Sequence, residues 1–424
     1  MISTPPKLTE PARFKLPAYE KLHLDNGIPV SILQADDPDV VKMEIVFDAG
    51  RYFESDRAVA KVTASTIKEG AGTMSSAQIA EKIDYYGANL STGADMDTAF
   101  IQTHFLGKYF EEILRIVRNI IIDPTFTDQE IQKYKTRQIE RLKNDLAKNE
   151  ILAYRYFTEH LFGQDHPYGY STKPEDYSKV DRQMVVSHYN DRFIANNCRI
   201  LITGNISGER LELLNNFLGK EIKINTQLQQ KEDIPVTVSP GRFRYENDRM
   251  YQTAIRIGKR MFNRHHSDYP AMYLLNTILG GYFGARLSSN IREDKGYTYG
   301  IYSAMDMMRR DGYFVVSTDV GNEYLESTIY EIYKELEKLR NELVPEDELK
   351  LVRNYIKGYM LSMINGNINT LSLIKTIELS QLDRDYFTWF VDKISEVTPD
   401  QLLVIANNHL PADEITEVLV GSFK

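Results

Sequence analysis

Cysteine is nearly absent from this chain of 424 residues, because Cys198 is the single one. One cysteine excludes an intramolecular disulfide and is typical of proteins from a reducing compartment. Cys198 lies in the apolar run NNCRILITG. Because a free cysteine usually behaves as a small hydrophobic residue, we expect it in the core rather than as a reactive thiol.

Long apolar runs and basic clusters are also missing. No segment approaches the roughly 18 apolar residues that a membrane-spanning helix needs. The start, MISTPPKLTEPARFKLP, lacks a basic region followed by an apolar core, so we expect a cytoplasmic protein by default, although a trimmed secretion signal would leave no trace. The 51 basic residues face 60 acidic ones, and the net charge is −9. No lysine and arginine cluster interrupts that balance, so we expect no nucleic acid partner.

Histidines at metal-ligand spacing are missing too. His265 and His266 are adjacent, so on a strand they would point to opposite faces and could not share one metal. His160 and His166 flank a glycine-containing turn and have no cysteine or carboxylate partner at ligand spacing. The glycine-rich GNISG is not a phosphate loop, because no lysine followed by serine or threonine comes after it.

Strand and helix patterns alternate in clusters through the first half. KLHLDNGIPVSIL places an Asp-Asn-Gly turn between two alternating runs, which predicts an antiparallel hairpin. VVKMEIVFDAG and NLSTGADMDTAFIQTHFL also have strand patterns, whereas residues 56–68, SAQIAEKIDYYGA and the stretch 127–163 have helical patterns. CRILITGNI predicts a buried strand that ends the first half.

The second half repeats this order. Residues 225–247 are polar, contain Pro235, Pro240 and Gly241, and have little helical period, so they predict a linker. A repeat of about 200 residues indicates duplication of a whole domain. We therefore expect an α+β fold with domains at 1–224 and 248–424. Each would be an antiparallel-rich sheet covered by helices, and the two would form a clamshell around a chamber.

Four segments carry a family resemblance. They are DAGRYFES at 48–55, the long stretch at 166–207 that begins HPYGYSTKPEDY, the glycine pair in ILGG, and NIREDKGYTYG. In this order they resemble the insulinase and pitrilysin family of zinc peptidases, which includes the mitochondrial processing peptidases and core subunits of a respiratory complex. The resemblance covers most of the chain.

The resemblance implies an inverted zinc motif, His-x-x-Glu-His, on the first helix after the early strand. Two imidazoles one turn apart would face one metal there, and the glutamate would act as general base. In this chain those positions fall on Lys61, Ala64 and Ser65. A protonated lysine repels a dication, alanine has no donor atom, and a serine hydroxyl is a poor zinc ligand. We therefore expect this chain to bind no metal or other cofactor.

The family's third ligand is a glutamate further along the chain. The matching position falls near Glu140 in TRQIERLKND. One carboxylate cannot hold a structural zinc ion by itself, and many charged residues surround Glu140. We interpret it as a solvated side chain on a helix.

An arginine and a tyrosine at the family's spacing are present. The resemblance implies that Arg292 and Tyr299 hold the backbone carbonyl of a substrate across the chamber, in trans to a zinc ion. A guanidinium group and a phenol are suitable donors to a developing oxyanion. From the residues alone, the alternative is that Arg292 pairs with Glu293 or Asp294 on a surface while Tyr299 belongs to an ordinary strand.

Half an active site implies a partner that supplies the other half. Our hypothesis is a noncatalytic subunit of a heterodimeric zinc peptidase, inactive alone, whose homologous partner carries the intact motif and the zinc. A second copy of this chain is an alternative partner. The peptide substrate would lie as an added strand on a sheet edge. Two competing hypotheses are a structural or peptide-binding scaffold, like the respiratory core subunits, and an enzyme that acts alone with different residues, for which the sequence offers no acid-base set.

Overall fold

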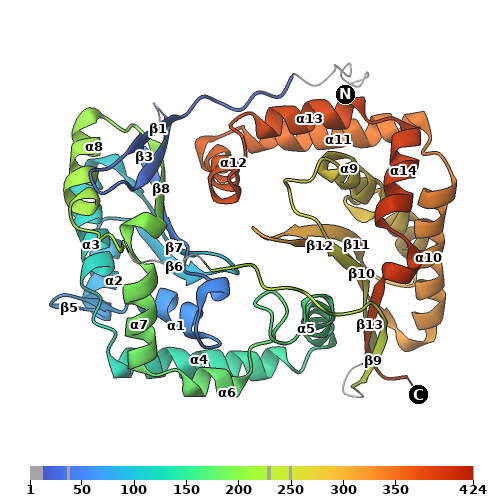
Figure 1. Cartoon of the computed structure of the whole chain (residues 1–424), viewed down its shortest axis with the longest axis horizontal. Coiled ribbons are helices and arrows are strands. Elements are labelled where there is room, and N and C mark those ends of the chain that lie inside the picture. The colour runs from blue at the N-terminus through green and yellow to red at the C-terminus, as the bar shows by residue number, and fades with distance from the viewer. Residues whose placement is uncertain (1–12, 36–38, 227–230, 248–250, 424) are drawn as a thin grey trace, which may run out of the picture.

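The chain folds into two halves, each built on its own β-sheet, and Figure 1 shows the halves facing each other across the molecule. This computed structural model describes residues 13–35, 39–226, 231–247 and 251–423. The first half, blue to green, lies on the left of Figure 1, and the second half, yellow to red, lies on the right. No helix in the described part of the chain is long and apolar enough to cross a membrane.

The first half contains a six-stranded sheet in the order β1-β2-β8-β3-β7-β6. Its strands are β1 (Glu20–His23), β2 (Pro29–Gln34), β3 (Val40–Phe47), β6 (Asn89–Ala94), β7 (Ala99–Leu106) and β8 (Cys198–Gly204). The predicted hairpin joins β1 to β2, and Gly27 has a φ of 82° in its turn. Strand β2 runs parallel to β8, and the other neighbours are antiparallel. Strands β4 (Gly70–Ala71) and β5 (Met74–Ser75) form a small separate ribbon.

The second sheet repeats this topology. Its order is β11-β12-β10-β13-β9. The strands are β9 (Arg242–Glu246), β10 (Gln252–Met261), β11 (Ile301–Met307), β12 (Gly312–Gly321) and β13 (Thr416–Gly421). Read from β9, the order matches β2-β8-β3-β7-β6, and the pair β13-β9 is parallel like β2-β8. The predicted α+β fold with two duplicated halves is confirmed.

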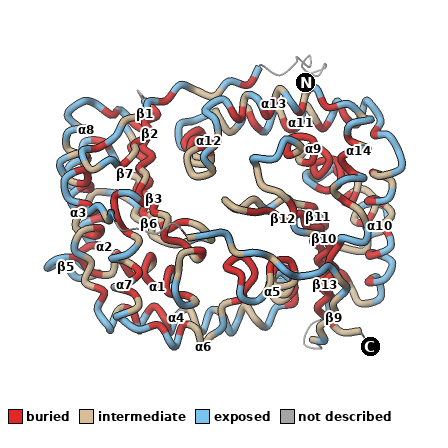
Figure 2. Tube along the Cα trace, viewed as in Figure 1, coloured by how far each residue is buried: buried red, intermediate tan, exposed pale blue. Residues whose placement is uncertain are grey.

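Helices cover each sheet, as predicted, although one helix of each half packs on the sheet of the opposite half rather than on its own. In the first half they are α1 (Val59–Thr66), α2 (Ser76–Tyr85), α3 (Phe110–Ile122), α4 (Asp128–Asp145), α5 (Asn149–Phe162), α6 (Pro174–Lys179), α7 (Arg182–Arg192) and α8 (Gly208–Leu214). In the second half they are α9 (Tyr269–Gly280), α10 (Leu325–Asn341), α11 (Glu346–Met363), α12 (Asn367–Ser380), α13 (Tyr386–Glu396) and α14 (Pro399–His409). Figure 2 shows buried positions along the strands of both sheets. Cys198 is among them, as predicted.

The halves exchange a helix across the molecule. Helix α5 of the first half packs against β10 and β13 of the second sheet, where Phe157 is fully buried with Val418. Helix α12 of the second half packs against β8 and β2, and its Ile374 is buried with Leu201. Successive strand residues point to opposite faces. Leu201 therefore meets α12, whereas its neighbour Ile202 joins the first half's own core.

The segment between the halves contains a strand. The sequence predicts a linker over 225–247, and the described residues 231–241 belong to no helix or strand. Residues Arg242–Glu246 of that segment, however, form β9 at the edge of the second sheet. Their alternating exposed and half-buried pattern suits an edge strand with one packed face. Where one domain ends and the next begins stays a prediction.

Candidate functional site

Helix α1 begins beside a half-buried carboxylate. Glu54 accepts hydrogen bonds from the backbone amides of Ala58 at 3.3 Å and Ala60 at 3.0 Å. Ala58 precedes the helix with a φ of 74°, a left-handed conformation that is uncommon for alanine. Burial raises the pKa of Glu54 to about 7, although the two amides and the charge of Arg51 oppose the shift. Glu54 therefore fixes the start of α1 and is poised to change protonation near neutral pH.

The three motif positions on α1 offer no zinc ligand. Lys61 extends into a cavity beside the helix, and burial, followed by the charge of Arg141, lowers its pKa. Ala64 is buried in the core of the first half. The Ser65 side chain pairs with the phenol of Tyr134, whose pKa is raised by burial. These residues do not fit a zinc ion, because one is cationic, one has no donor and one is already bonded.

The cavity beside α1 has a volume of about 390 Å³. Its walls come from the segment before α1, from α1 itself, from the end of β6, from helices α4, α5 and α6, and from the loop after α5 that carries Tyr170. Cationic side chains prevail: Arg51, Lys61 and Arg155 line it, against the acids Glu54 and Asp95. That charge balance opposes a metal cation.

Arg51 is the least satisfied of these cations. Its guanidinium group lies 3.4 Å from the ring centroid of Tyr170, in a stacked position. Its Nη1 has only the Met96 sulfur at 3.9 Å among the described residues. Its Nε and Nη2 are buried without a hydrogen-bond partner there, as is the Tyr170 hydroxyl. Burial lowers the pKa of Arg51 to about 10, so the group remains charged at neutral pH.

The third-ligand position does not reach the cavity. Glu140 lies on the exposed side of α4, where its carboxylate pairs with Lys143 at 2.8 Å. Its side chain is 63% exposed, so the solvated interpretation agrees with the structure. Two residues further along α4, Leu142 lines the cavity instead. Where α4 borders the cavity beside α1, it therefore presents an apolar side chain.

Arg292 and Tyr299 are positioned by the segment between α9 and β11. Arg292 lies in a π-helical turn at Ser288–Asp294, and its guanidinium carbon lies 3.7 Å from the ring centroid of Phe283. Its Nη2 donates to Glu293 at 2.5 Å, and its buried Nε has no partner among the described residues. Tyr299 is 96% exposed in the loop that precedes β11. Neither residue lines the cavity beside α1.

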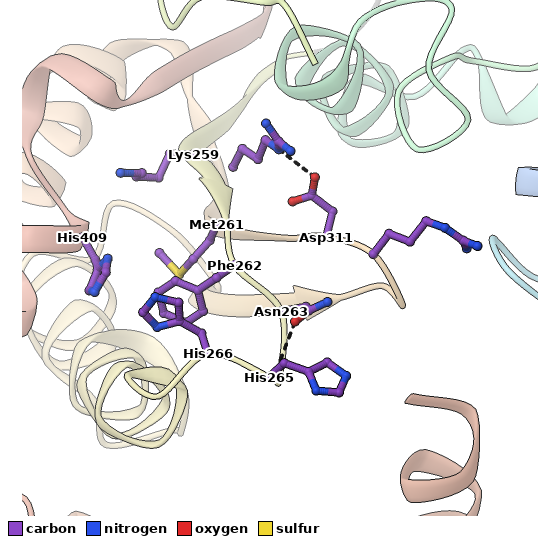
Figure 3. Close-up of a pocket in the computed structure, with 10 residues that line it drawn as sticks. Lys259, Met261, Phe262, Asn263, His265, His266, Asp311 and His409 are labelled. Atoms are coloured by element: carbon purple, nitrogen blue, oxygen red, sulfur yellow. Dashed lines mark hydrogen bonds and ion pairs between the residues drawn. The ribbon is translucent and has the colours of Figure 1, made fainter. Parts of the chain in front are cut away.

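The two adjacent histidines before α9, His265 and His266, have structural partners. His265 and His266 lie in a turn before α9 rather than on a strand, yet they diverge as predicted (Figure 3). His265 bonds the Ser380 carbonyl at 2.8 Å, while His266 stacks on Phe262. They line another cavity, of about 640 Å³, together with His409. In the described part of the chain, no three histidine, cysteine or acidic side chains are grouped so that they could hold a metal.

His160 and His166 are also engaged. The ring of His160 stacks on Phe243 at 3.4 Å between centroids, and its Nε2 lies 2.6 Å from the Tyr245 hydroxyl. His166 is buried and accepts a hydrogen bond from the Tyr168 amide at 3.0 Å. The contacts of His160 join α5 to β9, whereas the bond of His166 lies within the loop after α5. Neither histidine converges on a metal-binding group.

Three cavity residues escape sequence reasoning: Arg51, Glu54 and Tyr170. Their segments, DAGRYFES and HPYGYS, are recognisable as motifs. The motifs do not say that the two segments meet. A cation stacked on a ring more than a hundred residues away is a product of tertiary packing, so no local signal could have found it.

Two family models match the chain. The model described as insulinase, peptidase family M16, matches residues 30–164. The model described as peptidase M16 inactive domain matches residues 179–356. Together they span both halves.

Relatives with related names are found in bacteria. A Bacillus subtilis protein named uncharacterized zinc protease YmxG is 22% identical over 303 residues, covering 70% of this chain and 73% of that protein. A Helicobacter pylori protein named non-peptidase homolog YmxG is 21% identical over 255 residues, covering 58% of this chain and 56% of that protein.

Solved structures share the fold. The crystal structure of a peptidase M16 inactive domain from Pseudomonas fluorescens aligns with a TM-score of 0.86 and 22% identity, over 95% of this chain and 98% of that chain. The crystal structure of a protease from Helicobacter pylori aligns with a TM-score of 0.87 and 15% identity, over 96% of this chain and all of that chain.

Proposed function

The chain belongs to the insulinase family of peptidases, family M16, and on that premise we propose that it is a noncatalytic subunit that binds peptide beside a zinc-bearing partner of the same family. One observation carries this proposal: the ligand positions on α1 hold Lys61, Ala64 and Ser65, while Arg292 and Tyr299 are retained. The names of the inactive-domain neighbour and of the non-peptidase homolog support a chain without activity of its own. The zinc and the general base are expected on the partner.

The role we assign to this chain is to hold the reacting carbonyl. Tyr299 is 96% exposed, and its hydroxyl has no bond in the described part of the chain that would explain a structural role. Arg292 is fixed over Phe283, which limits the entropy it would lose on binding. In trans, a phenol and a guanidinium group would donate to the carbonyl oxygen of a bound peptide as negative charge develops there.

Strand β6 offers an edge for the peptide backbone. It ends the order of the first sheet and pairs with β7 alone among the described strands. An unpaired strand edge presents amide and carbonyl groups that a peptide can extend without regard to its sequence. The residues after β6, Asp95 and Met96, line the cavity beside α1. A peptide added there would run past the former zinc motif.

The scaffold hypothesis also has an observation in its favour. Arg292 is already bonded to Glu293 and stacked on Phe283, which is the surface arrangement that this hypothesis predicts. In that case the chain would keep the clamshell and perform no chemistry, with or without a second copy of itself. The single buried cysteine is consistent with a cytoplasmic location for either role.

Co-expression with the family member that carries an intact His-x-x-Glu-His motif in the same genome tests this proposal. We expect a complex of one copy of each chain by size-exclusion chromatography with mass measurement, and peptide hydrolysis by the pair alone. If this chain stays separate from every such member, the subunit proposal is wrong and the scaffold role is favoured. A homodimer without peptidase activity would have the same consequence.

A further inference from the structure

Two residues that line the cavity beside α1, Arg51 and Tyr170, hold three buried donors without partners among the described residues. They are Nε and Nη2 of Arg51 and the hydroxyl of Tyr170. Removing a charged group from water is costly unless its donors form hydrogen bonds. The stacking of Arg51 on Tyr170 recovers part of that cost. A ligand that accepts these hydrogen bonds would recover more.

The unpaired atoms of Arg51 have a defined geometry. Nε and Nη2 lie on the same side of a guanidinium group, and together they form the fork that binds a carboxylate through two parallel hydrogen bonds. The Glu54 carboxylate, which lines the same cavity, accepts from the amides of Ala58 and Ala60 and leaves this fork unpaired. The fork therefore has no protein partner in the described chain. Because both atoms are closed to solvent, a carboxylate would pair with them once the Arg51 side chain turns into the cavity that it lines.

The surrounding charges favour an anion. Lys61 and Arg155 line the same cavity, and the guanidinium carbon of Arg57 lies 4.6 Å from the centroid of the Tyr170 ring. Against these stand Glu54 and Asp95, and burial raises the pKa of both acids. The cavity therefore carries a net positive charge at and below neutral pH.

We propose that this cavity, at the place of the lost zinc motif, binds a carboxylate group of a peptide through Arg51 and Tyr170. Its volume of about 390 Å³ accommodates an acidic side chain or a peptide C-terminus. Asp95 and Met96 connect the cavity to the free edge of β6, so a strand added there would bring its carboxylate within reach. An arginine would thus bind a peptide at the place where the family's motif would hold a zinc ion. This inference needs no partner chain and stands apart from the role of Arg292 and Tyr299.

Ligand-observed NMR measures the binding of four small probes to the full chain. N-acetylglutamic acid α-amide carries a side-chain carboxylate, N-acetylglutamine carries an α-carboxylate, N-acetylglutamine amide is neutral, and inorganic phosphate is added at matched ionic strength. We expect at least one carboxylate to bind about tenfold tighter than the neutral amide, the range of a charge-assisted bidentate pair. The tighter carboxylate identifies an acidic side chain or a C-terminus as the source.

Variants assign that binding to the cavity. Arg51→Met, which keeps the length of the side chain, should weaken carboxylate binding about tenfold or more, and Tyr170→Phe should weaken it severalfold. Lys61→Met changes an exposed side chain and gives a second test if Arg51→Met does not fold. The control is Arg115→Met, because that guanidinium is 60% exposed on α3 and should leave binding unchanged.

Three results would overturn the proposal. The first is equal binding of the neutral amide and both carboxylates. The second is phosphate binding as tight as that of the better carboxylate, which would indicate a general anion site. The third is a carboxylate affinity that Arg51→Met, Tyr170→Phe and Lys61→Met all leave unchanged. None of these results would bear on the partnership with a zinc-bearing subunit, which is tested by co-expression.

Discussion

The guanidinium group of Arg309 lies 2.8 Å from the carboxylate of Asp48, and this ion pair joins the second half of the molecule to the first. Arg309 lies at the turn between β11 and β12, and Asp48 follows β3. Both side chains are 16% exposed. The backbone amide of Arg309 also donates to Asp97 at 3.1 Å. The hairpin of the second sheet is therefore anchored in the first half.

Replacing Arg309 should lower the free energy of unfolding. Arg309→Met removes one of the two arginines that hold Asp48, the other being Arg199 at 2.9 Å. We expect a loss of about 2 kcal/mol in the free energy of unfolding, because the pair is largely shielded from water. Urea unfolding measures the change. Arg115→Met, at an exposed pair, should cost less than about 0.5 kcal/mol, and equal losses in the two variants would contradict the prediction.

The exchanged helices make the halves interdependent. Ile374 belongs to the second half but is fully buried against the first sheet, so Ile374→Ala should cost about 2–5 kcal/mol. Urea unfolding measures this loss.

A fragment covering residues 13–224 should not fold cooperatively alone, because it would expose the sheet face that α12 covers. Circular dichroism and limited proteolysis of the fragment, with and without residues 225–424 supplied separately, test this prediction. A stable, protease-resistant isolated fragment would show that the exchange contributes little.

Glu54 should give the protein a measurable pH dependence. Its pKa is raised from 4.5 to about 7 in the folded state, mainly by burial. The stability it contributes is fully present below pH 4.5 and is lost as pH rises through 7, because the folded chain holds a proton that the unfolded chain has released. A displacement of this size corresponds to roughly 3 kcal/mol.

Glu54→Gln removes that titration. Urea unfolding at pH 5 and pH 8 measures the free energy of unfolding of both proteins. Between these pH values the wild type should lose up to about 3 kcal/mol more than the variant does. Arg51 and Lys231 are the cations that act on this carboxyl group. Glu111→Gln, at a side chain that is 50% exposed, is the control. A stability difference that does not vary with pH would mean that Glu54 titrates normally.

Arg292 and Tyr299 should affect turnover without affecting assembly. In a reconstituted complex with a zinc-bearing partner, Arg292→Ala and Tyr299→Phe should each lower kcat about 10²–10³-fold, the usual cost of losing an oxyanion donor. Zinc content and complex mass should stay unchanged. Tyr85→Phe is the matched control, because Tyr85 is 80% exposed on α2. Hydrolysis within about threefold of wild type for both variants would instead favour a structural role.

The purified chain should contain no stoichiometric zinc and cleave no peptide by itself. Lys61, Ala64 and Ser65 supply no ligand, and Arg51 and Arg155 add positive charge to the same cavity. Elemental analysis after exposure to excess zinc and desalting measures the content. One tightly bound zinc ion per chain would contradict this prediction and the description of the site.

The sequence by itself determined the local elements and their order. The Asp-Asn-Gly turn, the alternating strands and the apolar run around Cys198 specify structure through neighbouring residues, so the duplicated α+β topology was predictable. The missing ligands at Lys61, Ala64 and Ser65 were equally visible, because ligand chemistry depends on residue identity. The divergence of His265 and His266 was expected from strand geometry, whereas they diverge in a turn and line one cavity, so here the tertiary structure decided.

Tertiary structure decided which faces meet. Helical periodicity predicts a helical stretch over 127–163, but it does not reveal that α4 packs on α1 and α6 of the first half while α5 crosses to the second sheet. It also leaves open that Leu142, rather than Glu140, faces the cavity. The stacking of Arg51 on Tyr170 joins residues far apart in sequence. Such contacts arise when distant apolar faces are buried together, and a local pattern records that a face is apolar without recording its partner.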